Sequence, residues 1–201
     1  MTLEHKFVDG DPTKPVLLLL HGTGGGPDDL VGLARELSPQ SALLAPAGPV
    51  SEDGAARWFR RLAEGVFDYD DVVVRANQLA DFVLAAREQY GLADRRVVAL
   101  GFSNGANIAG AVTLLRPDVL TEAALFASML PVPDPPRHDL SGTKVFLSNG
   151  ERDPMAPLPS TEQFIGLLRE RGADVTLHRH PDGHQITWTA VEAAKAWLTI
   201  P

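Results

Sequence analysis

The chain has 201 residues, a length typical of one domain with a sizeable core, so we expect a single domain over residues 1–201. Hydrophobic residues make up 44% of the chain and charged residues 22%, as in soluble globular proteins. The formal net charge of −8 argues against nucleic acid or an anionic membrane surface as a partner. Because there is no cysteine, disulfides, thiol nucleophiles and cysteine metal sites are excluded.

Targeting and membrane signals are not evident along the chain. The first six residues lack the apolar segment of a secretory signal, and the longest early apolar run is only Val16–Leu20. We therefore expect a cytoplasmic protein without stable membrane insertion.

The first third of the chain alternates strand and helix patterns. Residues 2–15 are expected to form a polar edge strand and a turn. The continuous apolar run Val16–Leu20 is typical of a strand buried on both faces of a parallel sheet. Pro27 is expected to open a helix that ends at residues 38–39, and residues 41–45 are expected to form the next strand.

Residues 46–69 show no periodicity and are expected to form a long irregular loop. The segment contains Trp58, Phe59 and Phe67, and a long aromatic loop on a compact domain is typical of a functional element. A lid over the site and a dimer surface remain open as its role. A stripe of apolar residues over 72–90 then predicts a long helix that Gly91 ends.

Strands and helices continue to alternate to the end of the chain. Strands are expected near residues 97–101, 123–127, 144–148 and 175–179. Helices are expected over residues 106–115 and 161–171, the second opened by a Ser160-x-x-Gln163 capping box, and a final helix carries an apolar stripe from residue 186 to 197. The pattern predicts an α/β fold, with a doubly wound, mostly parallel sheet flanked by helices and no large cap domain.

The sequence Gly101-Phe102-Ser103-Asn104-Gly105 has the form G-x-S-x-G, with an apolar strand before it and an apolar helix after it. This is the pattern of a nucleophile elbow, in which a serine sits on a sharp strand-to-helix turn. The chain on either side must pass so closely that a side chain at position 101 or 105 would collide. The pattern alone also fits an ordinary turn with a helix-capping serine.

A serine nucleophile needs a base and an acid, and both are expected in loops that follow strands. Asp153 follows the strand near residue 148, and His184 follows the last strand. The chain order serine, aspartate, histidine is the order of an α/β-hydrolase, so we predict Ser103, Asp153 and His184 as a catalytic triad.

Other residues of suitable type are less well placed for these roles. Asp182 and Glu151 are alternatives to the acid, but Asp182 would have to fold back within one loop and Glu151 lacks the fixed turn of Asp153-Pro154. His178 and His180 lie at the last strand and are expected to be structural. Ser128 follows a strand but lacks flanking glycines.

An oxyanion hole requires two convergent backbone N–H groups. The N–H of Asn104, next to the nucleophile, is one candidate, and that of Thr23 in the glycine-rich loop His21-Gly22-Thr23-Gly24-Gly25 is the other. A phosphate-binding turn is the alternative for this loop, but the G-x-x-x-x-G-K-[ST] spacing is missing. His21 itself is expected to be a buried scaffold residue.

Apolar side chains near the carboxyl ends of the strands are candidates for a substrate pocket. Ordinary core or lid packing is the alternative for each of them. The candidates are Trp58, Phe59, Phe102, Met129 and Met155, with Phe67 and Leu158 nearby.

With these motifs in place, the whole chain resembles the small carboxylesterase and phospholipase family of α/β-hydrolases, which includes the acyl-protein thioesterases. Residues 101–106 are similar to the family's G-F-S-Q-G-[GA], and Arg57-Trp58-Phe59 resembles its aromatic segment. Asp153-Pro154 and Gly183-His184 match its acid and base loops. The resemblance implies hydrolysis of esters or thioesters without a cofactor or metal, and it is compatible with a homodimer.

Two departures from the pattern are informative. The elbow has Asn104 in place of glutamine, and the oxyanion loop reads H-G-T-G-G in place of H-G-L-G-D. Both resemble the bacterial branch of the family linked to quinone stress, which favours a small-molecule ester over an acylated protein as substrate.

The function predicted from these residues is that of a carboxylesterase-type serine hydrolase acting on short acyl or small aryl esters, with thioesters as a further class. Two alternatives stay open. One is a catalytically silent binding protein on the same fold, and the other is a serine peptidase or C–C hydrolase on the same scaffold.

Overall fold

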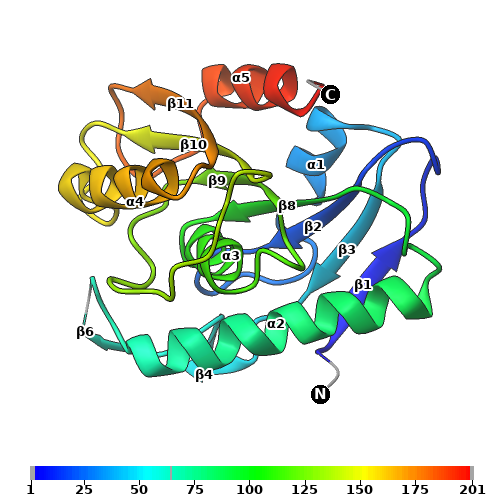
Figure 1. Ribbon diagram of the computed structural model, residues 1–201, viewed down its shortest axis with the longest axis horizontal. Helices are drawn as coiled ribbons and strands as arrows, with labels where there is room; N and C mark the ends of the chain where they lie inside the picture. The colour runs from blue at the N-terminus through cyan, green and yellow to red at the C-terminus, as the bar shows by residue number, and fades with distance from the viewer. Residues whose placement is uncertain (1–2, 64, 200–201) are drawn as a thin grey trace.

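The computed structural model describes residues 3–63 and 65–199, whose centre is a seven-stranded sheet (Figure 1). Its strands lie in the order β1-β3-β2-β8-β9-β10-β11, and only β1 runs antiparallel to its neighbour. The strands are β1 (His5–Val8), β2 (Val16–Leu20), β3 (Ala42–Pro46), β8 (Val97–Phe102), β9 (Glu122–Phe126), β10 (Lys144–Gly150) and β11 (Asp174–His180). The mostly parallel sheet predicted from the sequence is confirmed.

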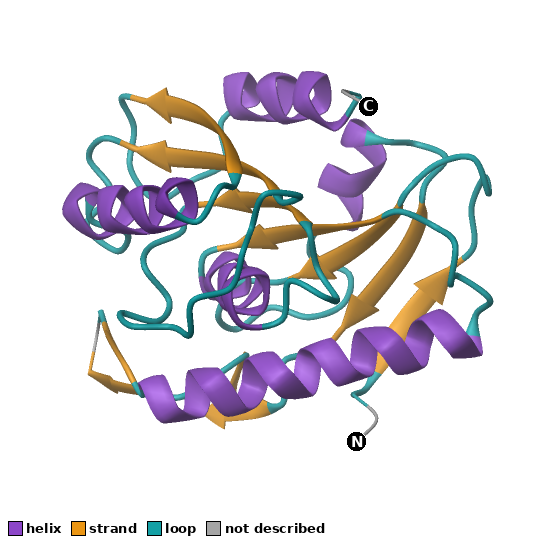
Figure 2. Cartoon of the chain, viewed as in Figure 1, coloured by secondary structure: helices purple, strands orange, loops and turns teal. Residues whose placement is uncertain are grey.

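Helices cover both faces of this sheet (Figure 2). One face packs against α2 (Tyr69–Gln89), α3 (Asn104–Leu115) and α4 (Leu158–Glu170), and the other against α1 (Val31–Leu37) and α5 (Trp188–Leu198). Alternate residues of β2 divide between the two cores, with Leu18 and Leu20 on the first face and Leu17 and Leu19 on the second. A strand buried on both faces is apolar at every position, which explains the run Val16–Leu20. In the part of the chain that is described, no helix is both long and apolar enough to cross a membrane.

Helices α1 and α4 do not begin with the signals that the sequence suggested. Pro27 does not open α1, because residues 27–30 form turns in which the N–H of Asp29 donates to the Gly26 carbonyl and that of Val31 to the Asp28 carbonyl. The capping box predicted at Ser160 is also wrong. Helix α4 begins at Leu158, with Pro157 as its N-cap, and Ser160 Oγ instead accepts a hydrogen bond from the N–H of Leu130.

The segment 46–69, predicted to be an irregular loop, forms two small hairpins. The first pairs β4 (Val50–Glu52) with β5 (Ala55–Arg57), and the second pairs β6 (Arg61–Ala63) with β7 (Val66–Phe67). The first turn is Asp53-Gly54, where both residues have positive φ, at +51° and +86°. Two positive φ angles are what a tight two-residue hairpin turn requires, and Asp-Gly is a sequence that adopts it readily.

Candidate active site

Ser103 sits at the sharp turn between β8 and α3, at the carboxyl end of the sheet. Its φ of +54° lies in a region that non-glycine residues rarely adopt, as expected of a nucleophile elbow. The turn is tight because the backbones on either side are in contact. A Cβ atom at Gly105 would lie 1.8 Å from the Leu20 carbonyl oxygen, and one at Gly101 would lie 2.7 Å from Ala106 Cα.

The structure brings Ser103, His184 and Asp153 into one hydrogen-bonded chain. His184 Nε2 lies 2.8 Å from Ser103 Oγ, and His184 Nδ1 lies 2.7 Å from Asp153 Oδ2. Because an ionised carboxylate can only accept, the bond to Asp153 places the imidazole proton on Nδ1 and leaves Nε2 to accept the serine proton. The Asp153 carboxylate is fully buried, and its Oδ1 accepts the N–H groups of Met155 and Ala156.

The alternative acids and bases lie outside this chain. Asp182 is 43% exposed and approaches His180, not His184, at 3.8 Å. His178 contacts Ser148 Oγ through Nδ1 at 3.1 Å, and burial, with a smaller contribution from His180, lowers its pKa below the ordinary 6.5.

The other two candidates from the sequence are structural. His21 is buried, its Nε2 accepting the Gly48 N–H while Nδ1 bonds the Gly22 carbonyl oxygen. Ser128 is buried, and its hydroxyl donates to Asn107 Oδ1.

Thr23 and Asn104, the predicted oxyanion donors, line the same pocket as Ser103 and His184. Asn104 is the first residue of α3, where backbone N–H groups have no acceptor inside the helix. No hydrogen bond between described residues uses the N–H of Thr23. Both residues thus line the pocket at Ser103 with backbone N–H groups that no described protein acceptor uses.

The first hairpin holds these two residues in place. The Gly24 N–H donates to the Ala56 carbonyl, and Arg57 Nη1 donates to Thr23 Oγ1 at 2.9 Å. On the other side, Asn104 Oδ1 accepts the N–H of Trp58 at 2.7 Å. The loop at residues 21–25 and the start of α3 are therefore fixed by the same short segment.

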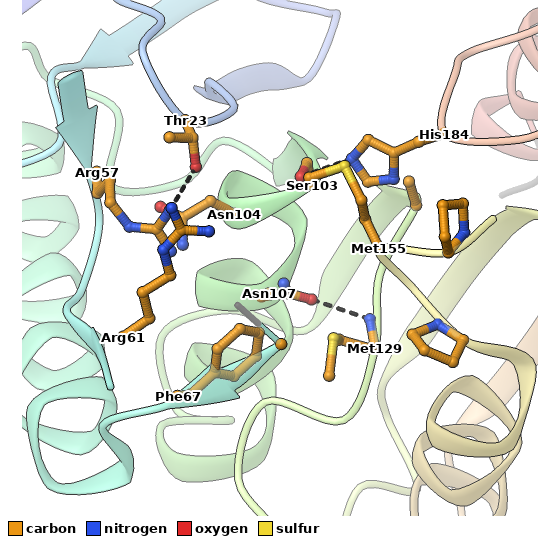
Figure 3. Close-up of a pocket in the computed structure, with 14 residues that line it drawn as sticks. Thr23, Arg57, Arg61, Phe67, Ser103, Asn104, Asn107, Met129, Met155 and His184 are labelled. Atoms are coloured by element: carbon orange, nitrogen blue, oxygen red, sulfur yellow. Dashed lines mark hydrogen bonds between the residues drawn. The ribbon is translucent and has the colours of Figure 1, made fainter. Parts of the chain in front are cut away.

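A pocket of about 500 Å³ opens at Ser103 (Figure 3). Met129 and Met155 line it, as the sequence predicted. Trp58 and Phe59 do not, and that part of the prediction is wrong. Both are completely buried, because Trp58 Nε1 donates to the His21 carbonyl and the Phe59 ring packs edge-on against Phe67.

Phe102 is also outside the pocket lining. Its ring lies beside the His184 ring, with centroids 5.2 Å apart, and packs on the core of the α1/α5 face. Sequence reasoning missed three polar residues of the pocket, Arg57, Arg61 and Asn107. The sequence Arg57-Trp58-Phe59-Arg60-Arg61 carried a signal for the two arginines. A charged side chain next to buried aromatic residues needs a polar or oppositely charged partner.

The described residues offer no group of three or more His, Asp or Glu side chains able to hold a metal ion. The chemistry available at the site is that of a hydroxyl with an adjacent imidazole base, a buried carboxylate behind it and backbone donors in front of it. Such a set can carry out acyl transfer through a covalent intermediate.

Comparisons with known proteins agree with this geometry. Residues 7–200 match the family model described as phospholipase/carboxylesterase. The chain is 42% identical over 195 residues to the protein MhqD of Bacillus subtilis (strain 168), with 97% of each chain covered. It resembles the crystal structure of the Bacillus cereus carboxylesterase with a TM-score of 0.94 and 40% identity, covering 98% of this chain and 93% of that one. A structure of YahD with malic acid has a TM-score of 0.92 and 30% identity, with 98% of each chain covered.

Proposed function

Because the chain belongs to the phospholipase/carboxylesterase family of α/β-hydrolases, we propose that it cleaves small carboxylic esters through an acyl-enzyme on Ser103. The observation that carries the proposal is the hydrogen-bonded chain from Ser103 Oγ through His184 to the buried Asp153 carboxylate. We also propose that residues 1–201 act as one catalytic domain in the cytoplasm.

The proposed reaction has two acyl-transfer steps. In the first, His184 Nε2 takes the hydroxyl proton of Ser103 while Oγ attacks the ester carbonyl, and the same proton then goes to the departing alcohol. In the second, His184 takes a proton from water, the resulting hydroxide attacks the acyl-enzyme carbonyl, and the proton returns to Ser103 Oγ. Asp153 keeps the His184 ring oriented and stabilises its positive charge in both steps.

The N–H groups of Thr23 and Asn104 serve in this proposal as the oxyanion donors. Each such donor lowers the barrier by about 2.7–4 kcal/mol, because it is already aimed at the oxygen where charge develops. The α3 N-terminus adds favourable dipole potential at the same point.

The pocket favours a small substrate. Its volume of about 500 Å³ suits a ligand of modest size, and Phe67, Met129 and Met155 supply apolar surface for a short acyl or aryl group. Thioesters of similar size fit the same chemistry, since the serine attacks an equivalent carbonyl.

The test is hydrolysis of p-nitrophenyl acetate and butyrate by the wild type and by Ser103→Ala, with mass spectrometry after a fluorophosphonate probe. We expect turnover and one adduct on Ser103, and a loss of about 10⁴-fold or more in kcat for the variant. A Ser128→Ala variant removes the rival serine and is expected to keep the adduct. Turnover that survives Ser103→Ala would contradict the proposal, and an unlabelled, inactive wild type would favour a binding protein.

A further inference from the structure

One side of the pocket at Ser103 is positively charged. Arg57 and Arg61 both line it, and the described lining residues include no aspartate or glutamate. Their guanidinium groups lie together beside Thr23 and Asn104, away from His184 and Met155 (Figure 3). The chain as a whole carries a net charge of −8, so the two arginines place positive charge beside Ser103 on a protein that is negative overall.

Arg57 is a buried cation with defined contacts. Its side chain is 4% exposed, its Nη1 donates to Thr23 Oγ1 and its Nε donates to the Phe59 carbonyl at 3.2 Å. Burial lowers the pKa of the Arg57 guanidinium, and nearby Glu52 opposes that shift while Arg61 adds to it. A cation removed from water in this way requires compensating negative charge.

Glu52 supplies one negative charge for two arginines. Its Oε1 accepts a hydrogen bond from Arg61 Nε at 2.8 Å, and its Oε2 lies 3.1 Å from Arg57 Nε. The three side chains together keep a charge of +1 at the pocket wall. Among the described side chains Glu52 therefore offsets only one of the two positive charges, which leaves the wall able to attract a further anion.

Hydrogen-bond donors remain for that anion. Within residues 3–63 and 65–199, three guanidinium nitrogens donate to no protein group: both Nη atoms of Arg61 and the Nη2 atom of Arg57. Arg61 lines the pocket and its side chain is 30% exposed, so a bound ligand can reach it. Guanidinium groups present paired N–H donors that match the two oxygens of a carboxylate.

We infer that Arg57, Arg61 and Glu52 form a subsite for a carboxylate, so that the esters cleaved at Ser103 carry a free carboxylate in the acyl or the alcohol part. The inference rests on the proposed function, whose substrate class it specifies. The charge of +1 matches a single carboxylate better than a phosphate, which carries up to two negative charges. The carboxylate lies on the Arg61 side of the pocket, and the ester carbonyl lies between Ser103 and the two backbone donors.

The test compares esters that differ only in that charge. Ethyl hydrogen adipate against ethyl adipamate places the carboxylate or its neutral amide in the acyl part, and 4-acetoxybenzoate against 4-acetoxybenzamide places it in the alcohol part. We expect the wild type to prefer the charged member of one pair by about tenfold or more in kcat/KM, mainly through KM. The pair that shows the preference identifies the part of the substrate that contacts Arg61.

Variants then connect the preference to Arg61. In Arg61→Gln the preference is expected to fall close to one, and Arg61→Lys is expected to recover part of it because the charge returns without the planar fork. The control is Arg60→Gln, since Arg60 is 61% exposed, pairs with Asp68 and does not line the pocket. It is expected to keep the wild-type preference. Equal kcat/KM for both members of both pairs in the wild type, or a preference unchanged in Arg61→Gln, overturns the inference.

A binding measurement separates this inference from the proposed function. Ser103→Ala, which cannot form the acyl-enzyme, is titrated with the same four compounds and followed by NMR. Tighter binding of a charged compound than of its amide, lost when Arg61→Gln is added, supports the subsite even where no ester is turned over. Equal affinity for the charged and neutral members overturns it, even where neutral esters are hydrolysed.

Discussion

The close contact between the turn at Ser103 and the chain at residues 20–21 predicts that Gly105→Ala damages both stability and activity. Gly105 is the second residue of α3, a position where alanine is ordinarily favourable. Here an added Cβ atom would lie 1.8 Å from the Leu20 carbonyl oxygen and 2.5 Å from the His21 carbonyl oxygen. Both are backbone atoms, so no side-chain rotation relieves the overlap.

The size of the effect follows from these distances. Cβ atoms are essentially never found within 3.0 Å of such atoms, so the gap to Leu20 has to open from 1.8 Å by about 1.2 Å. Overpacking of a close-packed core costs about 1–3 kcal/mol, and this overlap between two backbones belongs at the upper end. The same movement separates Ser103 and Asn104, at the start of α3, from Thr23, which follows Leu20 and His21. A misplacement of about 1 Å costs about 10²-fold in rate.

The assay pairs this variant with Gly166→Ala. Gly166 lies inside α4, and a Cβ atom there meets nothing within 4 Å outside its own helix. Alanine at that position is expected to raise the free energy of unfolding by about 0.5–1 kcal/mol. Urea unfolding followed by tryptophan fluorescence, together with kcat/KM for p-nitrophenyl acetate, measures both variants. Gly105→Ala with wild-type stability and turnover, or equal losses in the two variants, would refute the reasoning.

Three more predictions concern Asp153, the buried ring of Phe59 and the titration of His178. Asp153→Asn is expected to lower kcat by about 10⁴-fold with little loss of structure, because an amide no longer fixes the His184 tautomer; steady-state kinetics and circular dichroism check this. Phe59→Ala is expected to lower the free energy of unfolding by about 3–5 kcal/mol in urea titrations, since the ring is fully buried; a loss under 1 kcal/mol would contradict that placement. Burial holds the pKa of His178 below 6.5, so the unfolded chain takes up its proton first and stability decreases as pH falls through 6.5. Urea titrations between pH 7 and 5 are expected to show a smaller decrease for His178→Gln, and an identical decrease would count against this assignment.

The parts of the molecule that the sequence predicts well are those set by local rules. Val16–Leu20 was recognisable as a strand because both faces are buried, and the elbow glycines were recognisable because only glycine fits where two backbones touch. The side chains of Ser103, Asp153 and His184 meet because each follows a parallel strand, and such strands end at one edge of the sheet.

The parts that the sequence predicts poorly depend on which way a side chain faces in three dimensions. Arg57 and Trp58 are adjacent, yet Arg57 lines the pocket while Trp58 points into the core. Aromatic character alone indicates burial or a pocket, and only the register of the hairpin decides between them. The dipeptide Asp53-Gly54 indicates the turn of that hairpin. Its strands have only three residues each, which is too short for an alternation of apolar and polar residues to show which side chains face the core.

The hairpin also bears on whether segment 46–69 can act as a lid. Opening residues 55–59 would break the bonds from Gly24 to Ala56, from Arg57 to Thr23 and from Trp58 to Asn104, and would expose two buried aromatic rings. At about 0.5–1.5 kcal/mol for each bond and 1.5–3 kcal/mol for each ring, the cost is on the order of 5 kcal/mol or more. An open state would then hold less than about one molecule in a thousand, so these residues form a fixed wall beside Thr23 and Asn104, the proposed oxyanion donors. Within segment 46–69, the part that these contacts do not fix is the second hairpin, β6 and β7, where Leu62 is largely exposed and Phe67 reaches the pocket.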